Sequence, residues 1–419
     1  MADMQKVQDV VQDLVREGFD HEFGVPGAPL EANAEWKKLN AVGTQLWLDT
    51  GDLDVARQQF TEEFNALTTN NTLLNNEVQK GIYDELVKKA AAAIRGAAPD
   101  ISDQDLILEI AFVLNASHGL RLVKTFDAFV SVELHTDLSN DVTRSVEYGH
   151  RYWDICPERF VVKVPLTPAG YIAAGQLTDG GIPINFTLGF SARHNYLAAL
   201  LTRPRWVNVF MGRLGAFVAD HALGSGENIG EKATLATQRE LIALREARRS
   251  RTRLIGASMR NGAQVGTLAG LDVYTMPPKV AADYLKSPLA EVTSRVNDDP
   301  EPVLAEGISL DDFNGSTLWD VPGDFKKAVD AVAAKDIYTL TPDDLQEHFA
   351  QAGFADFLPR WSEEDIATAD RDGKIPVFDT WKQRLQAREV GLDALMNLSA
   401  LRSFTTDQTA FDDRVRSLL

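Results

Sequence analysis

Short apolar runs alternate with longer amphipathic segments between residues 44 and 290. The runs are rich in β-branched and aromatic residues and almost continuously apolar, which is typical of parallel strands buried on both faces. Eight such runs occur: TQLWLD (44–49), FNALTTN (64–70), AFVSVEL (128–134), RFVVKVP (159–165), IPINFTL (182–188), WVNVFMG (206–212), TRLIGAS (252–258) and LDVYTMP (271–277).

The segments between the runs have helical spacing, most clearly at residues 74–96, 193–202 and 231–249. The last of these has acidic and amide residues early and arginines late, as the helix dipole favours. Eight strand–helix units in a segment of this length predict a (β/α)8 TIM barrel, in the α/β class. A doubly wound open sheet is the structural alternative, although it usually needs fewer strands.

The pattern changes on both sides of the predicted barrel. Residues 1–43 begin with an amphipathic stretch that predicts an N-terminal helix. Beyond residue 290, an acidic, proline-bearing linker precedes helical patterns at 325–335, 341–354, 379–404 and 406–419, with TPDD and TTDQ as expected N-caps. We therefore expect three parts: an N-terminal helical segment (1–43), the barrel (44–290), and an acidic linker with C-terminal helices docked on the barrel (291–419).

Composition narrows the range of partners. The net charge of −19 argues against nucleic acid or an anionic membrane as the main partner, while a small anion can still bind in a local basic pocket. The single cysteine, Cys156, excludes an internal disulfide framework and fits a reducing compartment. The N-terminus lacks the order of a signal peptide, so we expect a cytoplasmic protein.

Polar side chains occur late in seven of the eight runs, where the chemistry of such barrels takes place. They are Asp49, Thr68, Thr69, Asn70, Glu133, Lys163, Asn185, Thr187, Asn208 and Ser258, with Arg213 and Arg260 just beyond the sixth and seventh runs. The eighth run offers nothing comparable.

Lys163 is the most unusual of these residues, because an unpaired ammonium is costly in an apolar strand. One interpretation is a buried ion network with Asp49 and Glu133 that fills the barrel. The other is a lysine whose pKa is lowered by burial and by nearby guanidinium groups, so that its free amine can form a Schiff base with a carbonyl compound. The two carboxylates would then transfer protons.

Arg213 and Arg260 have the side chains of a phosphate-binding site. A guanidinium group matches the oxygens of a phosphate, and barrels often bind phosphate near their last strands. The glycines of MGR and IGASMRNG allow backbone N–H groups to approach the same anion. The alternative is that each arginine forms a salt bridge on the acidic surface.

Seven motifs in chain order resemble the transaldolase family of class I, Schiff-base-forming barrels. They are LDTGD at Asp49, LTTNNTLL around Asn70, VSVE at Glu133, VVKVPLTPAG around Lys163, INFTLGFS with Asn185 and Thr187, VFMGRL with Phe210 and Arg213, and IGASMRN with Ser258 and Arg260. The resemblance covers residues 44–285.

The resemblance implies an enzyme of carbohydrate metabolism in the pentose phosphate pathway, which transfers a dihydroxyacetone unit from a ketose phosphate to an aldose phosphate. Lys163 would form the Schiff base, Asp49 would take the proton of the C4 hydroxyl, and Glu133 would move protons through a water held by Thr187. The implied substrate-binding residues are Asn70, Asn185, Asn208, Phe210, Arg213, Ser258 and Arg260. The resemblance implies no metal and no cofactor, and it leaves a homodimer open.

The sequence departs from the family pattern at several positions. Asn71 and Val209 stand where prolines are common, Asn208 where a serine helps to bind phosphate, and His194 where glutamine is usual. Three alternatives remain: an aldolase that releases dihydroxyacetone, a transaldolase for sulfonated sugars, and a non-catalytic binding subunit. Glu133 and Phe210 favour transfer over release, since such aldolases tend to have glutamine and tyrosine at these positions.

Overall fold

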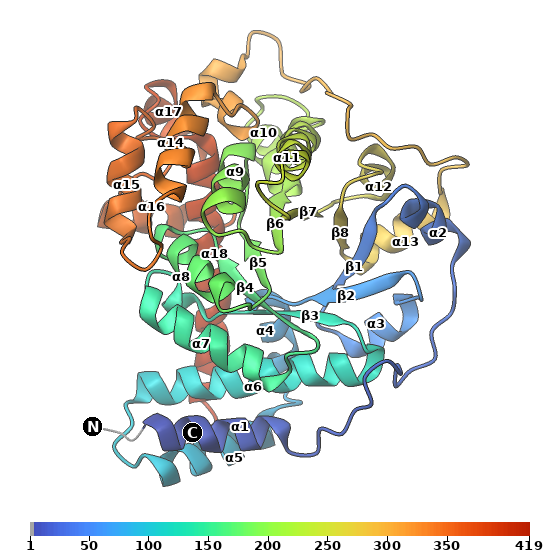
Figure 1. The fold of residues 1–419 in the computed structure, drawn as a ribbon, viewed down its shortest axis with the longest axis vertical. Coiled ribbons are helices and arrows are strands. Elements are labelled where there is room, and N and C mark those ends of the chain that lie inside the picture. The colour runs from blue at the N-terminus through green and yellow to red at the C-terminus, as the bar shows by residue number, and fades with distance from the viewer. Residues whose placement is uncertain (1–3) are drawn as a thin grey trace.

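Eight parallel strands close into a barrel in chain order in the computed structural model of the protein, which describes residues 4–419 (Figure 1). The predicted (β/α)8 fold is confirmed, and closure between β1 and β8 excludes the open sheet. Residues 1–3, with which the predicted N-terminal segment begins, lie outside the described residues. The strands are β1 (Gln45–Asp49), β2 (Phe64–Thr68), β3 (Phe129–Glu133), β4 (Phe160–Pro165), β5 (Ile184–Thr187), β6 (Trp206–Phe210), β7 (Arg253–Ala257) and β8 (Val273–Met276).

Helices precede, connect and follow the strands. Up to the end of the barrel they are α1 (Met4–Arg16), α2 (Ala34–Ala41), α3 (Leu53–Gln59), α4 (Asn71–Gln79), α5 (Asp84–Ala97), α6 (Asp103–Phe126), α7 (Val142–Ile155), α8 (Pro168–Asp179), α9 (Ala192–Leu201), α10 (Met211–Asp220), α11 (Ile229–Glu246), α12 (Gly262–Thr267) and α13 (Pro278–Lys286). The C-terminal helices are α14 (Gly323–Ala333), α15 (Pro342–Gln351), α16 (Glu363–Asp372), α17 (Phe378–Gln386) and α18 (Leu392–Arg416).

The strands fill the barrel interior with two kinds of side chain. A lower layer is apolar and includes Trp47 and Trp206, whose rings meet edge to face at 4.8 Å. Alternate residues of a strand face the same side, so the inward residues two positions further along carry the polar groups of the upper layer. Five strands (β1, β2, β4, β6 and β8) each place an apolar residue in the lower layer and a polar residue two positions further along, whereas β7 has the apolar Ala257 at the second position. The polar residues are Asp49, Thr68, Lys163, Asn208 and Thr275.

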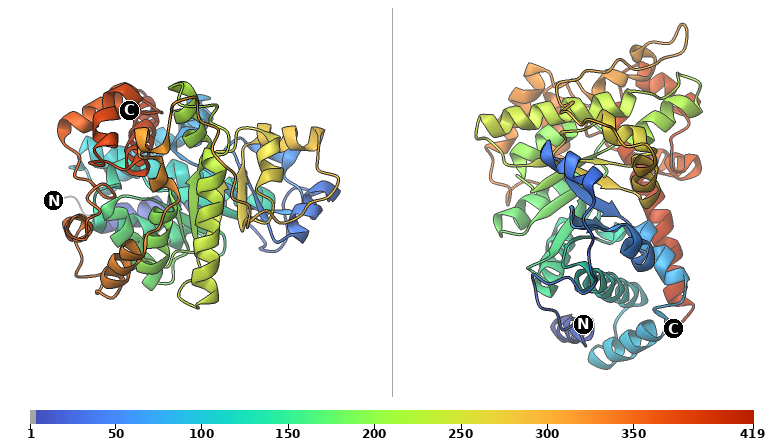
Figure 2. Two further views of the ribbon diagram at one scale, coloured as in Figure 1. Left: turned by 90° about the horizontal axis from the view of Figure 1, so that it is seen from above. Right: turned by 90° about the vertical axis from the view of Figure 1, so that its right-hand side faces the viewer.

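Helix α6 is the longest connection in the barrel. By length and composition it could cross a membrane, but 89% of its most apolar stretch is buried inside the protein. It packs against β3 on the outside of the barrel and lies with α1 and α5 at the bottom of the view in Figure 1, an arrangement that Figure 2 shows from two further sides. Its apolar character is therefore that of a core helix.

Three predicted helix boundaries are wrong. The helical pattern at 379–404 covers two helices, because α17 ends at Gln386 and α18 begins at Leu392, with Arg388 between them at a φ of +55°. The segment 74–96 was expected to form one helix, but the chain turns between α4 and α5, where Gly81 has a φ of +76°. Conversely, TTDQ does not cap a separate helix, because Thr405 and Thr406 lie inside α18 and their hydroxyls donate to the carbonyls of Leu401 and Arg402. A threonine can satisfy its hydroxyl in this way within a helix, so its cap preference gave the wrong boundary.

The C-terminal helices pack against the barrel helices. α14 contacts α9, α15 contacts α8, and α18 runs past α4 and α6, as the red helix in Figure 1 shows. The acidic linker before them is held at α11, where Lys232 pairs with Asp299 at 3.0 Å and with Glu301 at 3.5 Å.

A buried ion network joins this C-terminal region to the barrel. Arg193, in the first turn of α9, donates through Nε and Nη2 to the carboxylate of Asp393, both at 2.7 Å, and Nη2 also donates to Asp356 at 2.8 Å. Arg193 and Asp393 are almost completely buried. A bidentate pair of this kind satisfies both charges without water.

Replacement of Arg193 by methionine should lower the free energy of unfolding by about 3–5 kcal/mol, because the variant leaves two carboxylates without their partner. Urea denaturation followed by circular dichroism measures this change. Lys327→Met removes an exposed pair with Asp324 and is the matched control, with no measurable effect expected. Equal unfolding midpoints for Arg193→Met and Lys327→Met would contradict the anchoring role.

Candidate active site

A cavity of about 180 Å³ opens at the carboxyl ends of the barrel strands. Its lining includes Asp49 and Arg260, the first and last of the predicted site residues, which are more than 200 positions apart in the chain. The predicted residues that line it are Asp49, Asn70, Lys163, Asn185, Asn208, Phe210, Arg213, Ser258 and Arg260. Two predicted residues, Glu133 and Thr187, are not part of its lining.

Lys163 lies at the inner end of this cavity. Its register neighbours are Glu133 on β3 and Asn185 on β5, so the three side chains start from the same level of the barrel. Lys163 Nζ is 3.0 Å from Glu133 Oε2 and donates to the carbonyl oxygen of Thr69 at 3.0 Å. The lysine in the apolar strand is thus tolerated because it has a buried charged partner.

Glu133 lies behind Lys163, away from the substrate-sized space. Burial raises the pKa of its carboxyl, and the nearby Lys163 opposes this shift. Thr187 is completely buried, and its Oγ1 has no hydrogen-bond partner among the described residues. An unpartnered buried hydroxyl normally requires a water molecule or a ligand group.

Asp49 forms part of a short hydrogen-bonded chain. Thr68 donates to Asp49 Oδ1 at 2.7 Å, and Thr68 Oγ1 is 2.6 Å from Oγ1 of Thr275. Burial raises the pKa of the Asp49 carboxyl, whereas the Thr68 hydrogen bond and the charge of Lys163 lower it by less. Thr275 lines the cavity from β8, so the expectation that the eighth strand contributes nothing is wrong.

Three asparagines line the cavity, and each amide has one atom held by the protein. Asn70 Oδ1 accepts from the Leu73 N–H as the N-cap of α4, Asn185 Nδ2 donates to Ser131 Oγ, and Asn208 Oδ1 accepts from the Gly189 N–H. The opposite end of each amide remains for a ligand. Asn71 is the first residue of α4, a position that also suits proline, so this departure preserves the helix start.

The other end of the cavity is positively charged. Arg213 is 4% exposed, yet neither it nor Arg260 forms an ion pair within the described part of the chain. Burial and the neighbouring Arg260 lower the pKa of Arg213 to about 10. The surface salt-bridge interpretation is therefore wrong, and a buried cation without a carboxylate is typical of an anion site.

Tight backbone packing shapes this end. A Cβ at Gly212 would lie 2.0 Å from the carbonyl oxygen of Ser258, so only glycine allows the loops after β6 and β7 to meet. Ser258 itself has a φ of +62°, which is unfavourable for a residue with a side chain. Such strain often accompanies ligand-binding loops.

The C-terminal region supplies two lining residues that the sequence did not indicate. Lys374, between α16 and α17, lies at the positive end, and Phe404 of α18 faces Phe210 and Arg213. Both follow the barrel by about a hundred residues, and no local pattern marks them as part of its site.

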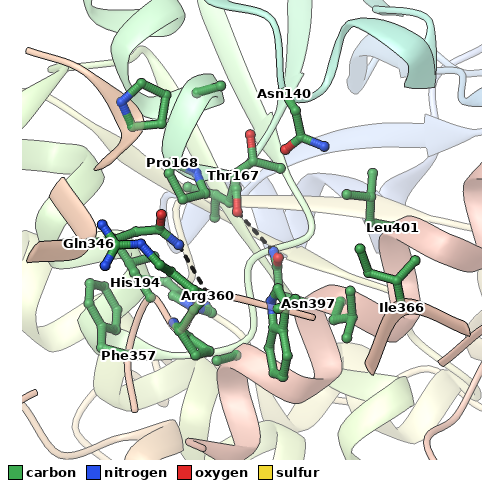
Figure 3. A pocket seen from close by; sticks show the side chains of 18 of the residues that line it. Asn140, Thr167, Pro168, His194, Gln346, Phe357, Arg360, Ile366, Asn397 and Leu401 are labelled. Atoms are coloured by element: carbon green, nitrogen blue, oxygen red, sulfur yellow. Dashed lines mark hydrogen bonds between the residues drawn. The ribbon is translucent and has the colours of Figure 1, made fainter. Parts of the chain in front are cut away.

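A second, larger cavity of about 430 Å³ lies between the barrel and the C-terminal helices (Figure 3). Thr167 and His194 of the barrel and Arg360 and Asn397 of the C-terminal region surround it. His194 lies in the first turn of α9, and burial lowers its pKa to about 4. The arginines that line this cavity, Arg360 and Arg402, are paired with Asp343 and Asp370, whereas the cations at the positive end of the smaller cavity have no such partners among the residues that the structure describes, so the smaller cavity is the candidate active site.

Comparison with known proteins gives consistent matches. The sequence profile of the family described as Transaldolase/Fructose-6-phosphate aldolase matches residues 46–335. The chain is 28% identical over 239 residues to a transaldolase of Xanthomonas euvesicatoria, which covers 55% of this chain and 71% of that protein. It is 27% identical over 303 residues to a transaldolase of Xanthomonas campestris (68% and 91%), and 27% over 241 residues to one of Protochlamydia amoebophila (56% and 73%).

The substitution Asp49→Asn should stabilise the folded protein at pH 8. The pKa of Asp49 is raised in the folded state, so its charge is unfavourable above that value and costs nothing once pH falls below the unfolded value of 3.8. The gain should therefore shrink as pH falls through the raised pKa of Asp49 toward 3.8, as measured by urea denaturation at several pH values. A gain that increases at lower pH would contradict the assigned direction.

Proposed function

The chain belongs to the transaldolase/fructose-6-phosphate aldolase family, and we propose that it is a transaldolase acting on phosphorylated sugars. It transfers a dihydroxyacetone unit from a ketose phosphate, such as sedoheptulose 7-phosphate or fructose 6-phosphate, to an aldose phosphate. The acceptors are glyceraldehyde 3-phosphate and erythrose 4-phosphate, as in the pentose phosphate pathway. The observation that carries this proposal is the position of Lys163, between two carboxylates at one end of a cavity with unpaired cations at the other.

The first step is attack of the Lys163 amine on C2 of the ketose. Glu133 Oε2 lies 3.0 Å from Lys163 Nζ, and its raised pKa makes it a better proton acceptor than an exposed carboxylate. It takes a proton from the ammonium and so provides the free amine. The resulting carbinolamine loses water to give the iminium, with Glu133 returning the proton to the departing hydroxyl. The unpartnered Thr187 hydroxyl supports the water that this exchange uses.

Cleavage of the C3–C4 bond follows. Asp49 accepts the proton of the C4 hydroxyl, the electrons of the broken bond move into the iminium, and the aldose leaves. Thr68 and Thr275 hold the Asp49 carboxylate in place through their hydroxyl chain. The retained enamine then attacks the aldehyde carbon of the acceptor, Asp49 returns its proton, and hydrolysis releases the new ketose.

The remaining lining residues bind the sugar. Asn185 and Asn70 present free amide atoms to the bound hydroxyl groups, and Arg213, Arg260 and Ser258 hold the terminal phosphate. Asn208 presents its Nδ2 there, because its Oδ1 is occupied by the Gly189 N–H. A ligand that carries its charge at one end and its carbonyl at the other is thereby oriented with C2 toward Lys163.

Fructose 6-phosphate and borohydride should leave a covalent adduct on Lys163, because reduction traps the iminium. Intact-mass spectrometry with peptide mapping measures it. Lys163→Met should give no adduct, while Lys327→Met, at an exposed and distant lysine, should be labelled like the parent. A folded protein without an adduct would refute the Schiff base and favour the non-catalytic binding subunit.

Glu133→Gln should slow transfer and shift the outcome toward release of free dihydroxyacetone, because related aldolases that release it tend to have glutamine at this position. The measurement compares fructose 6-phosphate with and without erythrose 4-phosphate. The parent protein should form sedoheptulose 7-phosphate when the acceptor is present and little free dihydroxyacetone without it. Rapid release from the parent protein would instead identify an aldolase, and unchanged partitioning in the variant would contradict the role of Glu133.

A further inference from the structure

The positive end of the cavity contains a third cation that comes from outside the barrel. Lys374 lines it with Arg213 and Arg260, and within residues 4–419 none of the three forms an ion pair with a carboxylate. Arg213 also contacts the main chain of Lys374, because its Nη1 donates a hydrogen bond to the carbonyl oxygen of Lys374 at 3.4 Å. Three positive groups thus converge where two would suffice for binding a single negative charge.

The loop that carries Lys374 is held firmly. Asp372 accepts hydrogen bonds from the Val377 N–H at 3.0 Å and from the Trp381 indole at 2.8 Å, which closes the loop between α16 and α17. Phe378, buried at the start of α17, packs edge to face on Phe217 of α10. Since α10 also carries Arg213, the loop and the arginine are positioned by the same helix.

The three charges disfavour one another while the cavity is without an anion. Burial, followed by Arg213 and Arg260, lowers the pKa of Lys374. Two carboxylates act in the opposite direction: Asp407, which accepts from the Thr72 hydroxyl, raises the pKa of Arg213 and Lys374, and Asp220 raises that of Arg260. Neither carboxylate restores the ordinary pKa of these three cations, so a bound anion relieves the repulsion that remains among them.

We propose that Lys374 is a substrate-binding residue that selects a doubly charged phosphate over a singly charged sulfonate. This inference rests on the proposed function, and it addresses a choice that Arg213 and Arg260 alone leave open. A phosphate monoester carries about −1.5 to −2 charges at pH 7, whereas a sulfonate carries one. An additional cation is therefore worth more to the phosphate, and the C-terminal region becomes a determinant of specificity.

The test compares the parent protein with Lys374→Met and Lys374→Arg. Substrates are fructose 6-phosphate, its 6-sulfonate analogue (6-deoxy-6-sulfofructose) and unphosphorylated fructose, each with erythrose 4-phosphate held at saturation. Lys374→Met should lower kcat/KM for fructose 6-phosphate about ten-fold, mainly through KM, which is the loss expected for a charged hydrogen bond at a partly exposed site. The loss should be about three-fold or less for the sulfonate and absent for fructose, and Lys374→Arg should restore most of the phosphate preference.

Lys382→Met is the matched control, because this lysine lies on the neighbouring α17 but does not line the cavity. It should leave all three substrates unchanged. Equal losses for phosphate and sulfonate in Lys374→Met, or no loss, would overturn the proposal. A fall in kcat for fructose would also overturn it, because it would indicate a structural effect.

Two further measurements separate this inference from the proposed function. Binding of inorganic phosphate, followed by calorimetry, should weaken about ten-fold in Lys374→Met whether or not turnover occurs, and unchanged binding would overturn the inference. Trapping with unphosphorylated dihydroxyacetone and borohydride should label Lys163 equally in the parent and the variant. Absence of label in the parent would refute the Schiff base while the phosphate measurement still decides the role of Lys374.

Discussion

The ion pair between Lys163 and Glu133 is the interaction around which this barrel is organised. An ammonium inside a closed sheet needs a partner, and the register of β3 and β4 supplies one at 3.0 Å. Burial of the pair raises the pKa of the Glu133 carboxyl, although Lys163 opposes this shift, and the register places the carboxyl close enough to exchange a proton with the amine. The ion pair that stabilises the buried Lys163 ammonium is therefore also suited to remove its proton when a carbonyl compound binds.

Much of the barrel could be predicted because its determinants are local. Each strand is a short apolar run, and its late polar residue falls at the same edge of a parallel sheet, so Asp49, Lys163 and Arg213 could be assigned to one site before their distances were known. Helix ends were less predictable. Thr405 and Thr406 have the side chains of a cap, but in α18 they donate to carbonyls of the preceding turn, and packing decides between these outcomes.

The contribution of the C-terminal region could not be predicted for a different reason. Lys374 lies in a short loop between two helices, and Phe404 lies within a long helix, and many other residues of the chain have the same local setting. Their place in the cavity results from long-range packing: Arg193 binds Asp393, and Asn397 donates to the carbonyl oxygens of Leu166 and Leu188 at the ends of β4 and β5. Such long-range contacts produce no periodic pattern in the sequence.

The Arg193–Asp393 pair has a consequence for how the molecule is made. Its two residues are 200 positions apart, so a ribosome has completed every strand of the barrel long before the acid that neutralises Arg193 is synthesised. The residues of the barrel therefore depend on the last-made part of the chain both for the acid that pairs with Arg193 and for Lys374 and Phe404, which complete the lining of the cavity.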